Sequence, residues 1–155
     1  MIRNTLTPII ALLLTLLVIA SCEKRKPVEP GIPLALAQAR KQAIANVQYD
    51  LVFNIPASRT DSIPARVTVR FDWIQKPIDL QLDFLPEESQ LKSMQVNGKP
   101  ATIRYENEHI LIDANNLSNP SNTITIDFIA GEAALNRNDD YLYTLFVPSR
   151  ASTCF

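Results

Sequence analysis

The feature that most constrains the fold is an alternation of apolar and polar residues that returns along the chain. A period of two places successive side chains on opposite faces of a strand, so each such segment predicts a strand with one apolar and one wet face. Asn97-Gly98, between two further apolar runs, favours a tight hairpin because both residues tolerate positive φ. A second tight turn is predicted at 106–108. The alternating segments are 47–55, 66–73, 78–84 and 124–128.

Together these strands predict a mainly β fold, an antiparallel β-sandwich or saddle-like domain. A different pattern precedes them. Residues 34–47 are rich in strong helix formers, and their apolar members recur at three- and four-residue spacing, which predicts a short amphipathic helix. The residues expected on its apolar face are Leu36, Ala39, Ala43, Ile44 and Val47.

The beginning of the chain has the pattern of a secretory signal. Arg3 precedes an uncharged apolar run over 9–19, which is too short to span a membrane permanently. The run leads into Ile-Ala-Ser-Cys at 19–22, which resembles the lipobox of bacterial lipoproteins, where cleavage occurs before a cysteine that carries a diacylglycerol. The alternative is a buried apolar helix of the mature protein.

The lipobox resemblance implies a membrane-anchored lipoprotein of the bacterial cell envelope, facing away from the cytoplasm. Residues 1–21 would be the signal peptide, and Cys22 would be lipidated. Residues 22–33 contain charges, prolines and a glycine, and they predict a tether between the membrane and the fold. The folded domain is expected over 34–155.

Composition narrows the classes of partner. The 155 residues carry a net charge of −1, and basic residues do not cluster with aromatic ones, which argues against nucleic acid as a partner. The chain has two cysteines. If Cys22 is a lipid thioether, Cys154 has no intramolecular partner, and the core must hold the domain without a disulfide.

The residues that carry chemistry form no familiar motif. His109 is the single histidine, it is expected to be exposed or satisfied by a neighbour, and nothing in the sequence places it beside Cys154. Zinc-binding patterns such as H-E-x-x-H and C-x-x-C are absent from the sequence. Asp139-Asp140 is a pair that could bind a cation, although its polar neighbours favour a loop. Residues 113–116 lack the glycine that an EF-hand loop requires.

From this inventory we expect the chain alone to be non-catalytic, with no metal-binding or cofactor-binding residues. The sequence is typical of a binding or structural module, and a complete small hydrolase is disfavoured because no catalytic constellation is present.

Several segments together carry a family resemblance. Residues 46–53 read NVQYDLVF, Val96–Lys99 read VNGK, and 122–131 read NTITIDFIAG. A tyrosine-containing segment over 135–144 follows, and the chain closes with RASTCF at 150–155. In this order they resemble the N-terminal domain of the aminopeptidase N family of zinc peptidases, whose final segment continues as Phe-Pro-Cys-Phe-Asp.

The resemblance implies a saddle-like β domain, truncated at its C-terminal end, that precedes a thermolysin-like catalytic domain. That missing domain would hold the zinc ion and use zinc-activated water to cleave N-terminal residues from peptides. Many members carry Gln-x-Glu near the end of this domain, where the side chains hold the substrate's α-amine. The corresponding positions are Leu145 and Val147. They would form an apolar wall of the parent's substrate pocket and leave its amine clamp weakened or supplied from elsewhere.

Two hypotheses from different classes follow. In the first, the chain is the non-catalytic N-terminal domain of a lipid-anchored, aminopeptidase N-like metallopeptidase. Its partners would then be the membrane and the catalytic domain, and peptides would bind only to the parent protein. In the second, it is a free-standing lipoprotein β-sandwich that binds a protein or a saccharide. The strand expected over 141–147 carries apolar residues on both faces, which predicts an uncovered apolar patch.

Overall fold

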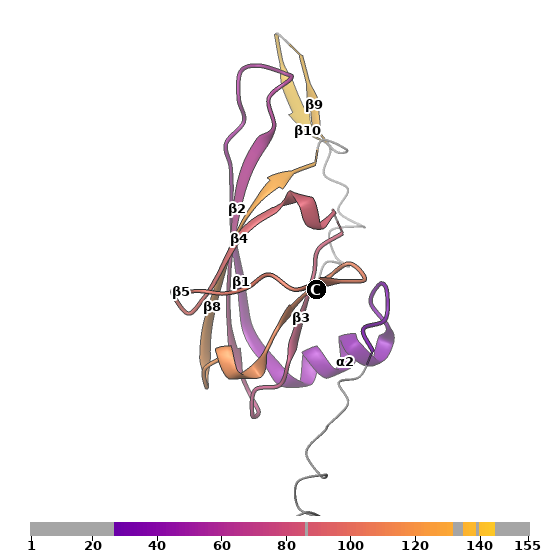
Figure 1. Ribbon diagram of the computed structural model, residues 1–155, viewed down its shortest axis with the longest axis vertical. Coiled ribbons are helices and arrows are strands. Elements are labelled where there is room, and N and C mark those ends of the chain that lie inside the picture. The colour runs from indigo at the N-terminus through magenta and orange to yellow at the C-terminus, as the bar shows by residue number, and fades with distance from the viewer. Residues whose placement is uncertain (1–26, 86, 132–134, 139, 145–155) are drawn as a thin grey trace, which may run out of the picture.

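The computed structural model describes residues 27–85, 87–131, 135–138 and 140–144 (Figure 1). Within these ranges the chain forms a short helix, α2 (Leu34–Ala43), followed by strands that pair antiparallel. The predicted mainly β fold with an N-terminal helix is confirmed. No helix in the described ranges has the length and apolar character needed to cross a membrane.

The larger sheet has five strands and forms one wall of the molecule. Its central strand is β8, which pairs over most of its length with β2 on one side and with β4 on the other. β1 lies at one edge and pairs only with β2 in the described part of the chain. Across the sheet the strands are β1 (Ile44–Phe53), β2 (Ile63–Trp73), β8 (Ser121–Ala130), β4 (Leu91–Val96) and β5 (Lys99–Pro100).

The smaller sheet packs on the inner face of the larger one. It consists of β3 (Leu80–Asp83), β7 (His109–Ile112) and β6 (Tyr105–Glu106), in that order. A separate hairpin is formed by β9 (Leu135–Arg137) and β10 (Leu142–Thr144), and Figure 1 shows it at the far end of the molecule from α2. Two single 3₁₀ turns, η2 (Glu88–Gln90) and η3 (Ala114–Asn116), lie in the connections.

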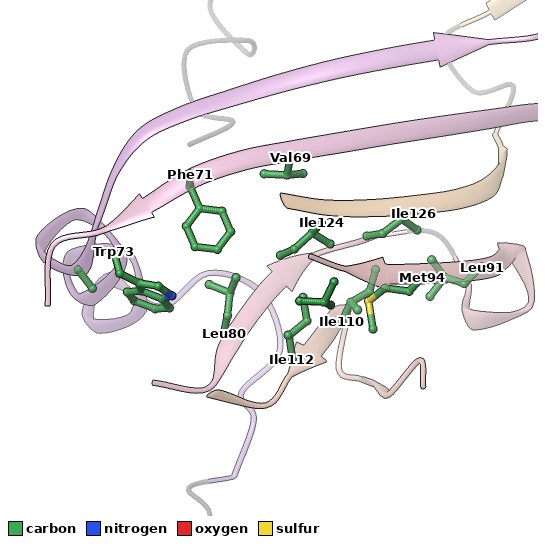
Figure 2. Close-up of a cluster of buried hydrophobic side chains, with 12 residues drawn as sticks. Val69, Phe71, Trp73, Leu80, Leu91, Met94, Ile110, Ile112, Ile124 and Ile126 are labelled. Carbon is green, nitrogen blue, oxygen red and sulfur yellow. The ribbon is translucent and has the colours of Figure 1, made fainter. Parts of the chain in front are cut away.

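The core lies between the two sheets, as Figure 2 shows. The strands alternate as predicted: Val69 and Phe71 of β2 point inward, whereas Arg70 between them is exposed. Each fully buried side chain of this size contributes about 1.5–3 kcal/mol through removal from water. The buried cluster consists of Val69, Phe71, Trp73, Leu91, Met94, Val96, Ile124 and Ile126 from the large sheet, Leu80, Ile110 and Ile112 from the small one, and Ala43 from α2.

Both predicted tight turns are present. Asn97 and Gly98 have φ values of 51° and 75°, and they connect β4 to β5 with Val96 opposite Lys99. The second turn lies between β6 and β7, where Asn107 and Glu108 also have positive φ. The chemistry of the turn residues therefore fixed both registers locally.

The predicted helix over 34–47 is too long. α2 ends at Ala43, and Ile44 and Val47 belong to β1 instead of the apolar face of the helix. Ile44 pairs with Trp73, and the N–H of Ile74 donates to the carbonyl of Ala43 at 2.8 Å. Sheet pairing next to the core thus outweighs the helix propensity of four residues, which is a weak preference.

Candidate functional site

An apolar row on β1 continues the core face of the large sheet. Tyr49, Leu51 and Phe53 lie opposite Val69, Val67 and Ala65 of β2, and directly opposite residues share one face of a sheet. Tyr49, Leu51 and Phe53 are nevertheless 55%, 53% and 49% exposed, whereas Val69 is 4% exposed. We call these three residues the β1 row.

The β1 row is exposed because the small sheet does not reach it. Among the residues of β1, Ile44 is the partly buried hydrophobic that packs against the buried cluster. The cluster's side chains from the large sheet come from β2, β8 and β4 (Figure 2). Val52, on the opposite face, is also exposed. β1 is therefore an edge strand with apolar side chains on both faces, a kind of edge that proteins usually cover.

The hairpin β9–β10 is held to the loop that joins β1 to β2. Arg137 of β9 is 7% exposed, and its guanidinium donates to backbone carbonyls of that loop. The acceptors are the carbonyl oxygens of Pro56 at 3.4 Å, Ser58 at 3.3 Å, Arg59 at 3.0 Å and Asp61 at 2.9 Å. The side chain of one arginine thus joins two segments that lie more than 75 residues apart in sequence.

The same hairpin presents aromatic side chains to solvent. Tyr141 and Tyr143 stack with ring centroids 6.0 Å apart and an interplanar angle of 26°. Both are exposed, as is Leu142 between them, and Asn136 donates to the hydroxyl of Tyr143 at 3.0 Å. This part of the predicted apolar strand is therefore uncovered. Leu145 and Val147, the predicted pocket wall, lie outside the described residues.

His109 is buried, with 1% of its surface exposed. Its Nε2 lies 2.9 Å from the carbonyl oxygen of Gly31 and 3.2 Å from that of Glu29. Its Nδ1 lies 2.9 Å from Oδ1 of Asp83, in a close contact that lacks the alignment of a hydrogen bond. The sequence predicts that His109 is exposed or satisfied by a neighbour; instead it is buried, and its Nε2 meets backbone carbonyls from a segment about 80 residues earlier in the sequence.

The other predicted polar positions have structural roles. Asp113 accepts a hydrogen bond from Nη1 of Arg104 at 2.8 Å, and both line an open pocket of about 250 Å³ beside η3. Asp140 is exposed, and its backbone N–H donates to Oδ1 of Asn138 in a turn. Asp139 lies outside the described residues. Among those described, no three His, Cys, Asp or Glu side chains gather as metal ligands would.

The shifted pKa values belong to structural contacts. Hydrogen bonds from Arg66 and Ser93 hold the pKa of Asp127 below its usual range. Those from Asn46 and Ser121 lower the pKa of Asp72. These carboxylates lie on the wet face of the large sheet, where Arg66 Nε is 2.6 Å from Asp127 Oδ1.

On the small sheet, burial raises the pKa of Tyr105, and the nearby Glu108, Glu88 and Glu87 raise it further. Its hydroxyl donates to the carbonyl of Phe84 at 3.1 Å. None of the described groups with a shifted pKa belongs to a cluster of three or more metal-ligating side chains.

Cys22 and Cys154 also lie outside the described residues. In comparisons with known proteins, no family model matches the chain and no curated protein matches it. The features that distinguish this molecule are the exposed β1 row, the β9–β10 hairpin with its two exposed tyrosines, and the buried side chain of His109. Sequence reasoning missed the role of Arg137, whose polar neighbours gave no sign of burial.

Proposed function

We propose that this chain is the non-catalytic N-terminal β domain of a lipid-anchored zinc metallopeptidase similar to aminopeptidase N, where it packs against the catalytic domain. The observation that carries the proposal is the β1 row. Three large apolar side chains lie in register with buried Val69 and Ala65 and half-buried Val67 of β2, and they remain about half exposed. A second domain laid along β1 would cover them as the small sheet covers β2.

The energetics favour such cover. Apolar surface removed from water contributes roughly 25 cal/mol per Å², and contiguous apolar patches on monomers mark interaction sites. The β1 row lies within residues 46–53, one of the segments that carry the family resemblance. This segment resembles the first strand of the family's N-terminal domain. The resemblance and the exposed face thus support the same proposal.

In this proposal the chain itself does no bond chemistry. The catalytic domain supplies the zinc ion and the activated water, and peptides bind to the parent protein. Leu145 and Val147 contribute an apolar wall to its substrate pocket, and Cys22 carries the lipid that holds the protein at the bacterial envelope. The role of the β domain is to position the catalytic domain relative to the membrane.

The test begins with the nucleotide sequence that follows the codon for Phe155. We expect codons for Pro-Cys-Phe-Asp, and further on for H-E-x-x-H, in the same or a shifted frame. The chain alone should bind no stoichiometric zinc and release no product from aminoacyl chromogenic substrates, whereas a protein that includes the downstream domain should do both.

Two outcomes contradict the proposal. Chelator-sensitive turnover that follows the chain alone through purification would make it an enzyme. A monomeric chain that binds no hydrophobic dye, with no such codons downstream, would favour the free-standing module that binds a protein or a saccharide.

A further inference from the structure

The segment before α2 is held on the domain by side chains of the β6–β7 hairpin. Asn107 in the turn donates from Nδ2 to the carbonyl of Val28 at 2.8 Å. Nε2 of His109 lies 2.9 Å from the carbonyl oxygen of Gly31 and 3.2 Å from that of Glu29. Carbonyl oxygens only accept, so a ring with its proton on Nε2 donates to them. Because the ring is 1% exposed, the segment is packed against the domain at this point.

The helix that follows is fixed to the small sheet. The guanidinium of Arg40 donates to both carboxylate oxygens of Asp83, at 2.8 Å and 2.6 Å, and to the carbonyl of Gln81 at 2.7 Å. Sheet pairing begins directly after the helix, at Ile44. The chain is therefore held on the domain from Val28 onward, and residues 28–31 of the expected tether belong to the folded part.

This docking shortens the connection to the membrane, a step that rests on the proposed lipid at Cys22. Five residues, 23–27, lie between Cys22 and Val28. An extended chain spans at most about 3.3–3.6 Å per residue, so the connection reaches roughly 20 Å at most. A tether that was free as far as Leu34 would reach roughly 40 Å. The docked segment thus keeps one end of the domain close to the lipid surface.

Apolar side chains are exposed at the same end. Ile32 is 47% exposed and Leu34 is 74% exposed, and both lie within six residues of Val28. Leucine and isoleucine side chains bind favourably at the boundary of headgroups and acyl chains. A short connection to the anchor also raises the effective concentration of that surface, so few side chains are needed. We call Ile32 and Leu34, with the exposed Ala35 and Gln38 of α2, the α2 end.

We infer that the α2 end of the domain rests on the lipid surface and that the β1–β2 loop points away from it. β1 runs from α2 to this loop, and its ten residues span roughly 33 Å at about 3.3 Å per residue. Figure 1 shows α2 at the opposite end of the molecule from the β9–β10 hairpin, which Arg137 holds to the same loop. The hairpin is therefore presented away from the membrane.

Charge does not drive this contact, because the basic and acidic side chains near the connection balance. We therefore expect the orientation to be the same on neutral and anionic lipids, since it depends on reach and on apolar side chains. The ion pair of Arg40 with Asp83 adds no net charge. The basic residues are Lys24, Arg25, Lys26 and Lys41, and the acidic residues are Glu23, Glu29, Glu106 and Glu108.

The experiment measures how close each end of the domain lies to the bilayer. The lipidated chain with Cys154→Ser is labelled with a fluorophore through Gln38→Cys on α2 or Arg59→Cys in the β1–β2 loop, two exposed positions. It is placed in vesicles of phosphatidylcholine, with or without phosphatidylglycerol, that contain headgroup spin-labelled lipid as a quencher. We expect quenching to be at least about threefold stronger at position 38 than at 59 in both vesicles, because the two ends lie roughly 33 Å apart.

Variants separate the length of the connection from the apolar contact. Insertion of about twelve glycine and serine residues after Lys26 forms a flexible coil and should reduce the difference between the labels. Leu34→Gln should reduce quenching at position 38. Leu142→Gln is its matched control, because Leu142 is also exposed but lies on the β9–β10 hairpin, and it should change nothing. Circular dichroism verifies that each variant folds.

Incorporation of labelled fatty acid is measured on the same samples, so that the anchor and the orientation are tested separately. Equal quenching at the two positions of an acylated chain would overturn the orientation and leave the anchor and the domain assignment standing. Equal effects of Leu34→Gln and Leu142→Gln would overturn it as well. Absence of acylation would instead contradict the proposed anchor and, with it, this orientation.

Discussion

Tyr49 lies directly opposite Val69 on the same face of the large sheet, yet Tyr49 is 55% exposed and Val69 is 4% exposed. The difference arises because the small sheet covers β2 and stops short of β1. An edge strand with this composition is a template for association. It also offers the sharpest place to test whether the domain has a packing partner.

Leu51→Gln should reduce binding of a hydrophobic dye and any self-association of residues 23–155, because it places an amide in the centre of the β1 row. Stability should change by less than about 0.5 kcal/mol, as is usual for exposed positions. Val52→Gln is the matched control, since Val52 is also exposed on the same strand but points to the other face. Equal effects of the two variants would argue against a specific docking face.

Arg137→Met should destabilise the chain by about 2–3 kcal/mol in urea unfolding. In the native chain the carbonyls of the β1–β2 loop accept hydrogen bonds from the charged guanidinium of Arg137, and the substitution removes this donor. Hydrogen bonds to a charged group contribute about 1.5–3 kcal/mol. Arg59→Met is the control, because Arg59 contributes only its backbone carbonyl to Arg137 and its side chain is exposed. A loss below about 0.5 kcal/mol for Arg137→Met would show that the loop and the hairpin are held by other contacts.

Stability should fall in acid partly through Asp127. Its pKa is lowered in the folded state, so its stabilising contribution is complete above the unfolded value of about 4 and is lost as the pH falls through the lower folded value. Asp127→Asn should therefore flatten the dependence of the melting temperature on pH below about 4, with a modest effect because the pair is partly exposed. An unchanged acid slope in this variant would contradict the assignment.

Cys22→Ala should abolish incorporation of labelled fatty acid and release the protein from membranes. The prediction rests on the Ile-Ala-Ser-Cys tetrad and on the stable anchoring that two acyl chains provide. Cys154→Ala serves as the control and should remain acylated. A Cys22→Ala protein that is still labelled and still sediments with membranes would show that the lipoprotein assignment is wrong.

Local patterns in the sequence were sufficient to predict strands and turns. The alternation over 66–73 and 124–128 became β2 and β8, and Asn97-Gly98 became the β4–β5 turn. These features depend on nearest neighbours along the chain: side-chain direction in an extended backbone and tolerance of positive φ. The end of α2 was misplaced because the pairing of Ile44 with Trp73 is a contact between distant residues.

The rest was decided by tertiary structure. Alternation predicted an apolar face on β1 as clearly as on β2. The apolar face of β2 is buried and that of β1 is exposed, because the small sheet covers β2 and stops short of β1. Similarly, no local pattern brings His109 to Gly31 or Arg137 to Asp61, since these contacts join residues 76 or more positions apart. Sequence alone determined which segments are strands, because that depends on local periodicity. Tertiary structure decided what each apolar face and each buried charge meets, because that depends on which distant segments the fold places together.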